Sequence, residues 1–167
     1  MGNCAGRILI GSGSDLVAER LPRAAALALT AATFCALFLL AALGGRALLT
    51  VVAAGAGLSI GAIAGLEPVL VADMYGLDNF GVNYSALSIP GFVMSLALGQ
   101  YLPGLVYDAH VVPGTHTCLG KQCFQQTFLV LAAFSASGVL SAVLLTLRVM
   151  RAADRRALDD KLAPLNA

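Results

Sequence analysis

Charged and aromatic residues are scarce in this sequence. Charged residues make up 11% of its 167 residues, there are four tyrosines, and there is no tryptophan. Soluble domains carry about 25% charged residues, because their surface must face water. Hydrophobic residues reach 59% here and occur in long blocks. The composition therefore excludes an ordinary soluble globule and predicts an integral membrane protein.

Signatures of catalysis and of cofactor binding are also missing. We find no phosphate-cradling glycine loop, no helix with a metal-ligand pair, and no nucleophile with a positioned base. The few basic residues alternate with acids, which argues against binding to nucleic acid. The sequence thus predicts neither an enzyme nor a cofactor or metal site, and the lipid bilayer is the first partner it indicates.

Four apolar runs have the length of about 20 residues that a transmembrane helix needs. They predict an all-α, multi-pass helical bundle that forms a single membrane domain over 1–167, with a kink near Pro90 in its third span. Residues 1–14 are too short to cross, so they form either a partial helix or a disordered N-terminus. Residues 151–167 form a tail that suits a short surface helix with paired charges. The predicted spans are 24–43, 47–72, 84–107 and 123–150.

The basic residues predict the orientation. An even number of spans puts both termini on one side, where eight of the ten basic residues then fall. By the positive-inside rule, the termini and the corner 73–81 are cytoplasmic and the loop 108–122 lies outside. The eight are Arg7, Arg20, Arg23, Arg148, Arg151, Arg155, Arg156 and Lys161, against Arg46 and Lys121. The sequence does not indicate which membrane.

Two rows of small residues recur at every fourth position within the spans. Such a row lies on one helix face and lets another helix backbone approach closely. We expect these faces to pack against other helices or against other copies of the chain. The first row is Ala53, Gly57, Gly61 and Gly65, and the second is Ala133, Ser137 and Ser141.

Cys118 and Cys123 lie in the loop that the charge count places outside, where disulfides persist. Four residues separate them, including Gly120, and the spacing favours a disulfide. The alternative is a zinc site with His110 and His116, although the spacing matches no standard ligand pattern. Cys35 is read as a small apolar filler within a span, and Cys4 has no assigned role.

A few polar residues lie within the spans. Glu67 is a candidate for proton coupling, because ionisable groups inside spans are costly and face a cavity or a partner. It also lies near the cytoplasmic end of its span, where it can pair with Arg7 or Arg20. Ser95 and Gln100 line a transport path or bond to a neighbouring helix.

Several local patterns coincide in order along the chain. The first is Asn3-Cys4-Ala5-Gly6-Arg7 with Gly11, Ser14-Asp15 and Leu21-Pro22-Arg23, which resembles the loop between helices eight and nine of major facilitator superfamily transporters, in their nodulin-like branch. The segment 75–81 with Tyr84 is similar to the region between helices ten and eleven. Tyr107-Asp108, 118–124 and Thr127-Phe128 resemble the last outer loop and the start of helix twelve.

The resemblance implies a partial major facilitator fold, from the end of helix eight through helix twelve. It implies the C-terminal part of a secondary transporter of a small solute, not transport-competent without the remaining transporter helices. Arg7 and Asp15 would belong to a cytoplasmic gating motif, with Arg23 and Asp73 as further candidates. Asp15 and Asp73 can equally be ordinary caps, as can Asp78. The alternative function is a self-contained four-span protein with an oligomerisation or assembly role.

Overall fold

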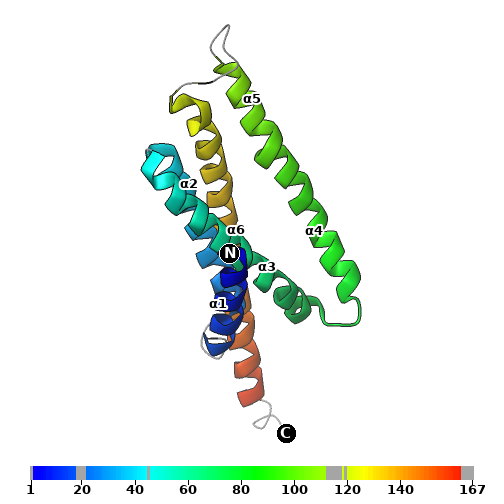
Figure 1. The fold of residues 1–167 in the computed structure, drawn as a ribbon. Helices are drawn as coiled ribbons and strands as arrows, with labels where there is room; N and C mark the ends of the chain where they lie inside the picture. The colour runs from blue at the N-terminus through cyan, green and yellow to red at the C-terminus, as the bar shows by residue number, and fades with distance from the viewer. Residues whose placement is uncertain (1, 18–21, 45, 112–117, 119, 163–167) are drawn as a thin grey trace.

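A computed structural model describes residues 2–17, 22–44, 46–111, 118 and 120–162, and it is helical almost throughout (Figure 1). The elements are α1 (Gly2–Val17), α2 (Arg23–Leu43), α3 (Arg46–Tyr75), α4 (Phe80–Leu96), the π-helical turn η1 (Ala97–Tyr101), α5 (Leu102–Ala109) and α6 (Gln122–Leu162). Four segments are long and apolar enough to cross a membrane: Arg23–Leu43, Leu48–Tyr75, Phe80–Ala109 and Gln122–Arg155. The all-helical class and the four span-length helices agree with the prediction.

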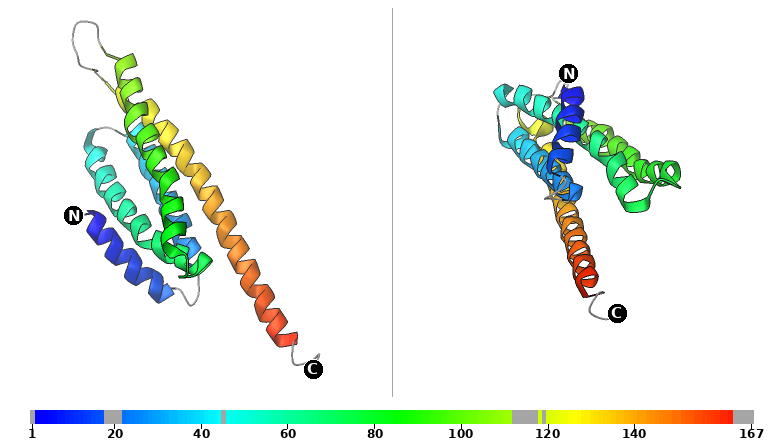
Figure 2. Two further views of the ribbon diagram at one scale, coloured as in Figure 1. Left: turned by 90° about the vertical axis from the view of Figure 1, so that its right-hand side faces the viewer. Right: turned by 90° about the horizontal axis from the view of Figure 1, so that it is seen from below.

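The packed part of the molecule consists of α1, α2, α3 and α6. α2 lies along α6, and α3 lies between α2 and α1 (Figures 1 and 2). A small apolar core joins Leu37 and Ala41 of α2, Val52 of α3 and Phe128 of α6. The ring of Phe38 extends this core, with its centroid 6.5 Å from that of Phe128.

The segment Phe80–Ala109, which we call the arm, comprises α4, η1 and α5. It stands beside the packed helices, and its contacts with them are concentrated where α4 follows α3 and where α5 meets α6 (Figure 1). No residue of α4, η1 or α5 is buried. Large apolar side chains are open along it, including Val82, Ile89, Phe92 and Tyr101, each more than 60% exposed. The arm thus presents an apolar surface that only lipid or further helices can cover.

The arm departs from α-helical geometry at Ala97–Tyr101 and not at Pro90, which lies inside α4. η1 directly precedes Pro103 in the first turn of α5. A proline lacks the N–H that would bond four residues back, and its ring collides with that carbonyl, so a wider turn accommodates it. The irregular turn therefore lies further along the chain than the expected kink.

The tail is not a separate surface helix. α6 continues without a break from Gln122 to Leu162, 41 residues in all. At 1.5 Å per residue it is about 60 Å long, twice the thickness of the hydrocarbon core. Neither glycine nor proline occurs between Arg148 and Leu162, so nothing in the sequence stops the helix where the charged residues begin.

Candidate functional site

α1 and α3 touch through their backbones along a seam of glycines. Gly2 lies next to Gly57, and a side chain on Gly65 would begin 3.7 Å from the Cα of Arg7. A Cβ on Gly6 would overlap the carbonyl oxygen of Leu58, and one on Gly61 would overlap that of Asn3. The two helices run parallel, because successive residues of α1 meet successive turns of α3. Only glycine fits at the two closest points.

The structure places three members of the first small-residue row, Gly57, Gly61 and Gly65, in this seam. Ala53, one turn earlier on α3, is exposed. The matching feature of α1 is Gly2 and Gly6, four residues apart. Sequence reasoning missed that pair, although its spacing is the same small-residue signal.

The second small-residue row lies on an open face of α6. Ala133, Ser137 and Ser141 are all exposed. The hydroxyl of Ser137 donates to the carbonyl of Phe134 at 2.7 Å, and that of Ser141 to the carbonyl of Ser137 at 3.0 Å. α6 packs instead through other residues, among them Cys123, Thr127 and Ala132, which are at most 3% exposed. The carbonyl of Ala132 lies 3.6 Å from the sulfur of Cys35, the residue read as a filler.

An ion pair ties the start of α2 to the last turn of α3. Arg23 Nη1 donates to Asp73 Oδ2 at 2.8 Å, with the two side chains 27% and 48% exposed. Asp73 lies inside α3, so it is not a loop cap. A carboxylate near a helix C-terminus is unfavourable because that end carries partial negative charge, and the Arg23 guanidinium offsets this cost.

The other two gating candidates lie on α1. Arg7 Nε donates to Asn3 Oδ1 at 3.1 Å within α1. Asp15 lies near the end of α1, and its side chain is outside the described part of the structure. Among the described side chains, the structure brings Arg23 and Asp73 together across 50 positions of the chain.

The transport-path candidates lie on two different elements. Glu67 is partly buried on α3, one residue before Pro68, and forms no ion pair or hydrogen bond with any described residue. Its expected partner Arg7 bonds Asn3, and Arg20 falls outside the described residues. Ser95 and Gln100 are exposed on the arm. Ser95 and Gln100 are therefore accessible to a further helix or a solute, and Glu67 is accessible only in part.

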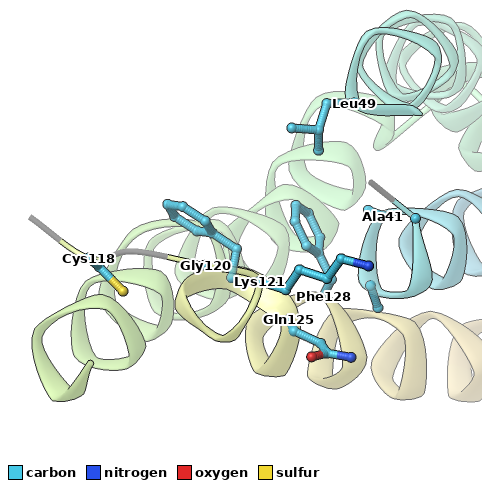
Figure 3. Close-up of a pocket in the computed structure, with 10 residues that line it drawn as sticks. Ala41, Leu49, Cys118, Gly120, Lys121, Gln125 and Phe128 are labelled. Carbon is cyan, nitrogen blue, oxygen red and sulfur yellow. The ribbon is translucent and has the colours of Figure 1, made fainter. Parts of the chain in front are cut away.

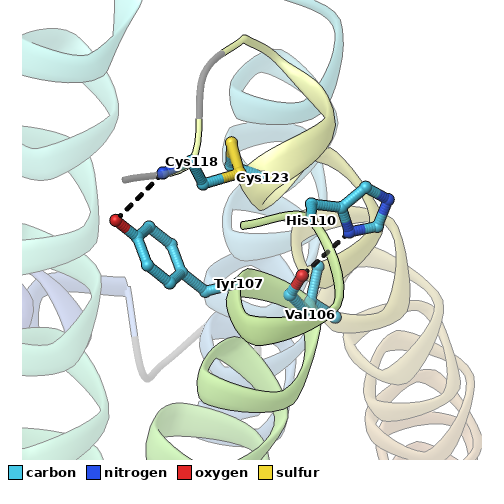
Figure 4. Close-up of a disulfide and its surroundings, with 5 residues drawn as sticks. All are labelled: Val106, Tyr107, His110, Cys118 and Cys123. Carbon is cyan, nitrogen blue, oxygen red and sulfur yellow. Dashed lines mark hydrogen bonds between the residues drawn. A yellow bond between two sulfur atoms is a disulfide. The ribbon is translucent and has the colours of Figure 1, made fainter. Parts of the chain in front are cut away.

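A disulfide links Cys118 to Cys123, with Cα atoms 6.0 Å apart (Figure 4). The Cys118 N–H donates to the hydroxyl of Tyr107 at 3.2 Å, and the Tyr107 ring lies 5.9 Å from that of Phe124. Cys118 also forms an isolated bridge with Val111. We call these residues the clasp, because they connect the end of α5 to the start of α6: Tyr107, Val111, Cys118, Cys123 and Phe124.

The zinc alternative at the clasp loses its thiol ligands to the disulfide. His110 Nδ1 lies 2.9 Å from the carbonyl of Val106, one turn back on α5 (Figure 4). His116 lies outside the described residues.

Comparison with known proteins gives the family. A family model described as the NFD4 C-terminal domain matches residues 17–153, most of the chain. The chain belongs to this nodulin-like family. The matched region contains α2 to α5, both ends of the Arg23–Asp73 pair, the clasp and most of α6.

One similar relative is the protein NUCLEAR FUSION DEFECTIVE 4 of Arabidopsis thaliana, 30% identical over 99 residues. The alignment covers 55% of this chain and 17% of the relative. The chain thus matches less than a fifth of that protein's length. No solved structure matches.

Proposed function

We propose that this chain forms the C-terminal part of a secondary transporter for a small solute, with a partial major facilitator fold. Three points support the proposal: the nodulin-like family, the four span-length helices, and the order of the motifs along the chain. In this proposal the termini and the Arg23–Asp73 pair are cytoplasmic, and the clasp is on the opposite side.

The observation that carries the proposal is the arm. It is a 30-residue apolar segment that contacts the other helices at its two ends and has no buried residue. Such a segment needs further helices to cover its apolar side chains. Ser95 and Gln100 lie on it, and polar groups inside spans face a pathway or a partner helix. We propose that the remaining transporter helices cover the arm, and that the chain does not transport without them.

The ion pair suits a cytoplasmic gate. Arg23 and Asp73 hold the inner ends of α2 and α3 together, and their partial exposure keeps the cost of separating them low. In the proposed cycle the pair is closed while the cytoplasmic side is shut, and it opens when these helix ends move apart.

A second candidate is a four-span assembly protein. The open row Ala133, Ser137 and Ser141 favours it, because this face of α6 can accept another helix from a second copy. In that case the arm and this row would be covered by copies of the same chain.

Cysteine crosslinking distinguishes the two. Phe92→Cys on the exposed arm, in a background with Cys4 and Cys35 replaced by serine, is crosslinked in native membranes. Links to helices of a larger polypeptide support the transporter, and links between two copies at position 92 support assembly. Arg151→Cys is the matched control, since it follows the apolar run 123–150, where the charged end of α6 begins.

An immunoblot of the source with an antibody against 151–167 gives the size of the native product. A band at about three times 17.0 kDa is expected for a twelve-span transporter. That product is then placed in vesicles and tested for uptake of a panel of labelled small solutes. A native band near 17.0 kDa, or no uptake of any solute above empty vesicles, contradicts the transporter proposal.

A further inference from the structure

A hollow of about 380 Å³ lies between the ends of three spans, on the side of the clasp (Figure 3). Its apolar wall comes from the last turn of α2, the first turn of α3 and the first two turns of α6, namely Ala41, Ala42, Leu49, Phe124 and Phe128. Since these residues stand where span-length helices end, the hollow lies at the depth where hydrocarbon gives way to lipid headgroups.

Two polar side chains, Lys121 and Gln125, line the same hollow. Lys121 extends from the start of α6 toward Phe128 and Ala41 (Figure 3). It forms no ion pair with any residue in the described ranges, and none of the described residues that line the hollow carries a carboxylate. An ammonium group without a counter-charge, above an apolar wall, suits a ligand with an anionic head and an apolar body.

We propose that the hollow binds an anionic phospholipid from the membrane leaflet on the clasp side. Its phosphate lies at Lys121 and Gln125, and one acyl chain lies over Phe124 and Phe128. The depth favours a phospholipid over a soluble anion, because headgroup phosphates are concentrated at this level. An anionic lipid is favoured over phosphatidylcholine, whose own cation already accompanies its phosphate. Lipid binding at this hollow does not depend on whether the protein transports a solute.

The test uses photocrosslinking of the full chain in phosphatidylcholine vesicles. Each sample contains a trace of either phosphatidylglycerol or phosphatidylcholine with a photoreactive group on one acyl chain, and the labelled peptides are identified by mass spectrometry. We expect phosphatidylglycerol to label the peptide around Phe124 and Phe128 more strongly. We expect Lys121→Gln to lower that labelling about fivefold, because the contact of one lysine with an anionic headgroup contributes roughly that factor to binding.

Two further variants isolate the charge at the hollow. Lys121→Arg keeps the cation and should keep the labelling. Lys161→Gln removes the chain's other lysine, at the far end of α6, and should have no effect. An unchanged midpoint of thermal unfolding in each variant shows that the helices around the hollow still pack together.

Three results would overturn the proposal. Equal labelling by the two lipids would mean that the hollow does not select an anion. Unchanged labelling in Lys121→Gln would mean that Lys121 does not bind the headgroup. Full competition by soluble glycerol phosphate would identify a small-anion site in place of a lipid site.

Discussion

The α1–α3 seam and the arm are both apolar helical regions with many glycines, but the glycines have different surroundings. In the seam, Gly6 and Gly61 lie so close to the opposite backbone that no side chain fits. In the arm, Gly81, Gly91, Gly99 and Gly104 have nothing within 4 Å of where a Cβ would stand. Glycine thus lies in a tightly packed helix contact in the seam and on an uncovered helix face in the arm.

This difference has a physical basis in the membrane. Lipid tails are as apolar as leucine, so burial alone does not drive helices together, and close backbone packing supplies much of the attraction. A row of small residues makes such packing possible but does not determine which helix packs against it. The seam has its partner within the chain, whereas the middle of the arm and the second row on α6 have none among the described residues.

The sharpest test of the comparison is a large residue in each region. Gly61→Leu should destabilise the chain by about 3 kcal/mol, the upper end of the overpacking range, because the new side chain overlaps the Asn3 backbone. The midpoint of thermal unfolding in detergent measures the effect. Gly91→Leu in the arm is the matched control, and equal midpoints for the two variants would refute the contrast.

The clasp is expected to contribute next. Replacing Cys118 and Cys123 by serine removes the disulfide and should cost about 2 kcal/mol, the chain-entropy value for so short a loop. The same variant should loosen the contact of Tyr107 with Cys118, and thereby the outer end of the arm. Hydrogen exchange of α5 measures the loosening. Cys4→Ser, at an exposed cysteine, serves as control; unchanged exchange in the double variant would show that the clasp does not hold the arm.

The Arg23–Asp73 pair should have a smaller effect on stability. Both side chains are partly exposed, so the coupling should be at most about 1 kcal/mol and should fall as salt is added. A double-mutant cycle with Arg23→Gln and Asp73→Asn isolates it from other effects of each change. The charge-swapped variant, which combines Arg23→Asp with Asp73→Arg, should recover part of the coupling. A coupling of zero at low salt would remove the pair from the gate.

The smallest effect is expected on the open row of α6. Ser137→Ala should change the unfolding free energy of the chain alone by less than about 0.5 kcal/mol, because the hydroxyl bonds only its own helix. The unfolding free energy of the same variant is then measured in the full-length native product. A clear loss of stability there would show that another helix covers this face.

The sequence predicted those features that depend on local pattern. Apolar runs of sufficient length predicted the spans, and the spacing of Gly57, Gly61 and Gly65 indicated a packing face. It did not identify α1 as the partner of that face, since Gly2 and Gly6 lie in a segment too short to cross the membrane. A short helix needs no full span when its backbone lies directly on a neighbour.

Long-range pairing was beyond the sequence. Arg23 and Asp73 were both candidates for the cytoplasmic end, yet no local rule pairs residues 50 positions apart. Asp73 was also read as a cap, because the corner after it is polar, whereas α3 continues past it to Tyr75. The hollow depends on three chain segments meeting and had no signal in any one of them.

The unbroken α6 has a mechanical consequence. A rod of about 60 Å that is tied to α2 over its first half behaves as a lever. If α2 and α6 tilt together by about 10°, the far end of the rod moves by about 10 Å. The charged end of α6 therefore converts small rotations of the packed helices into displacements that a probe at Arg155 can measure.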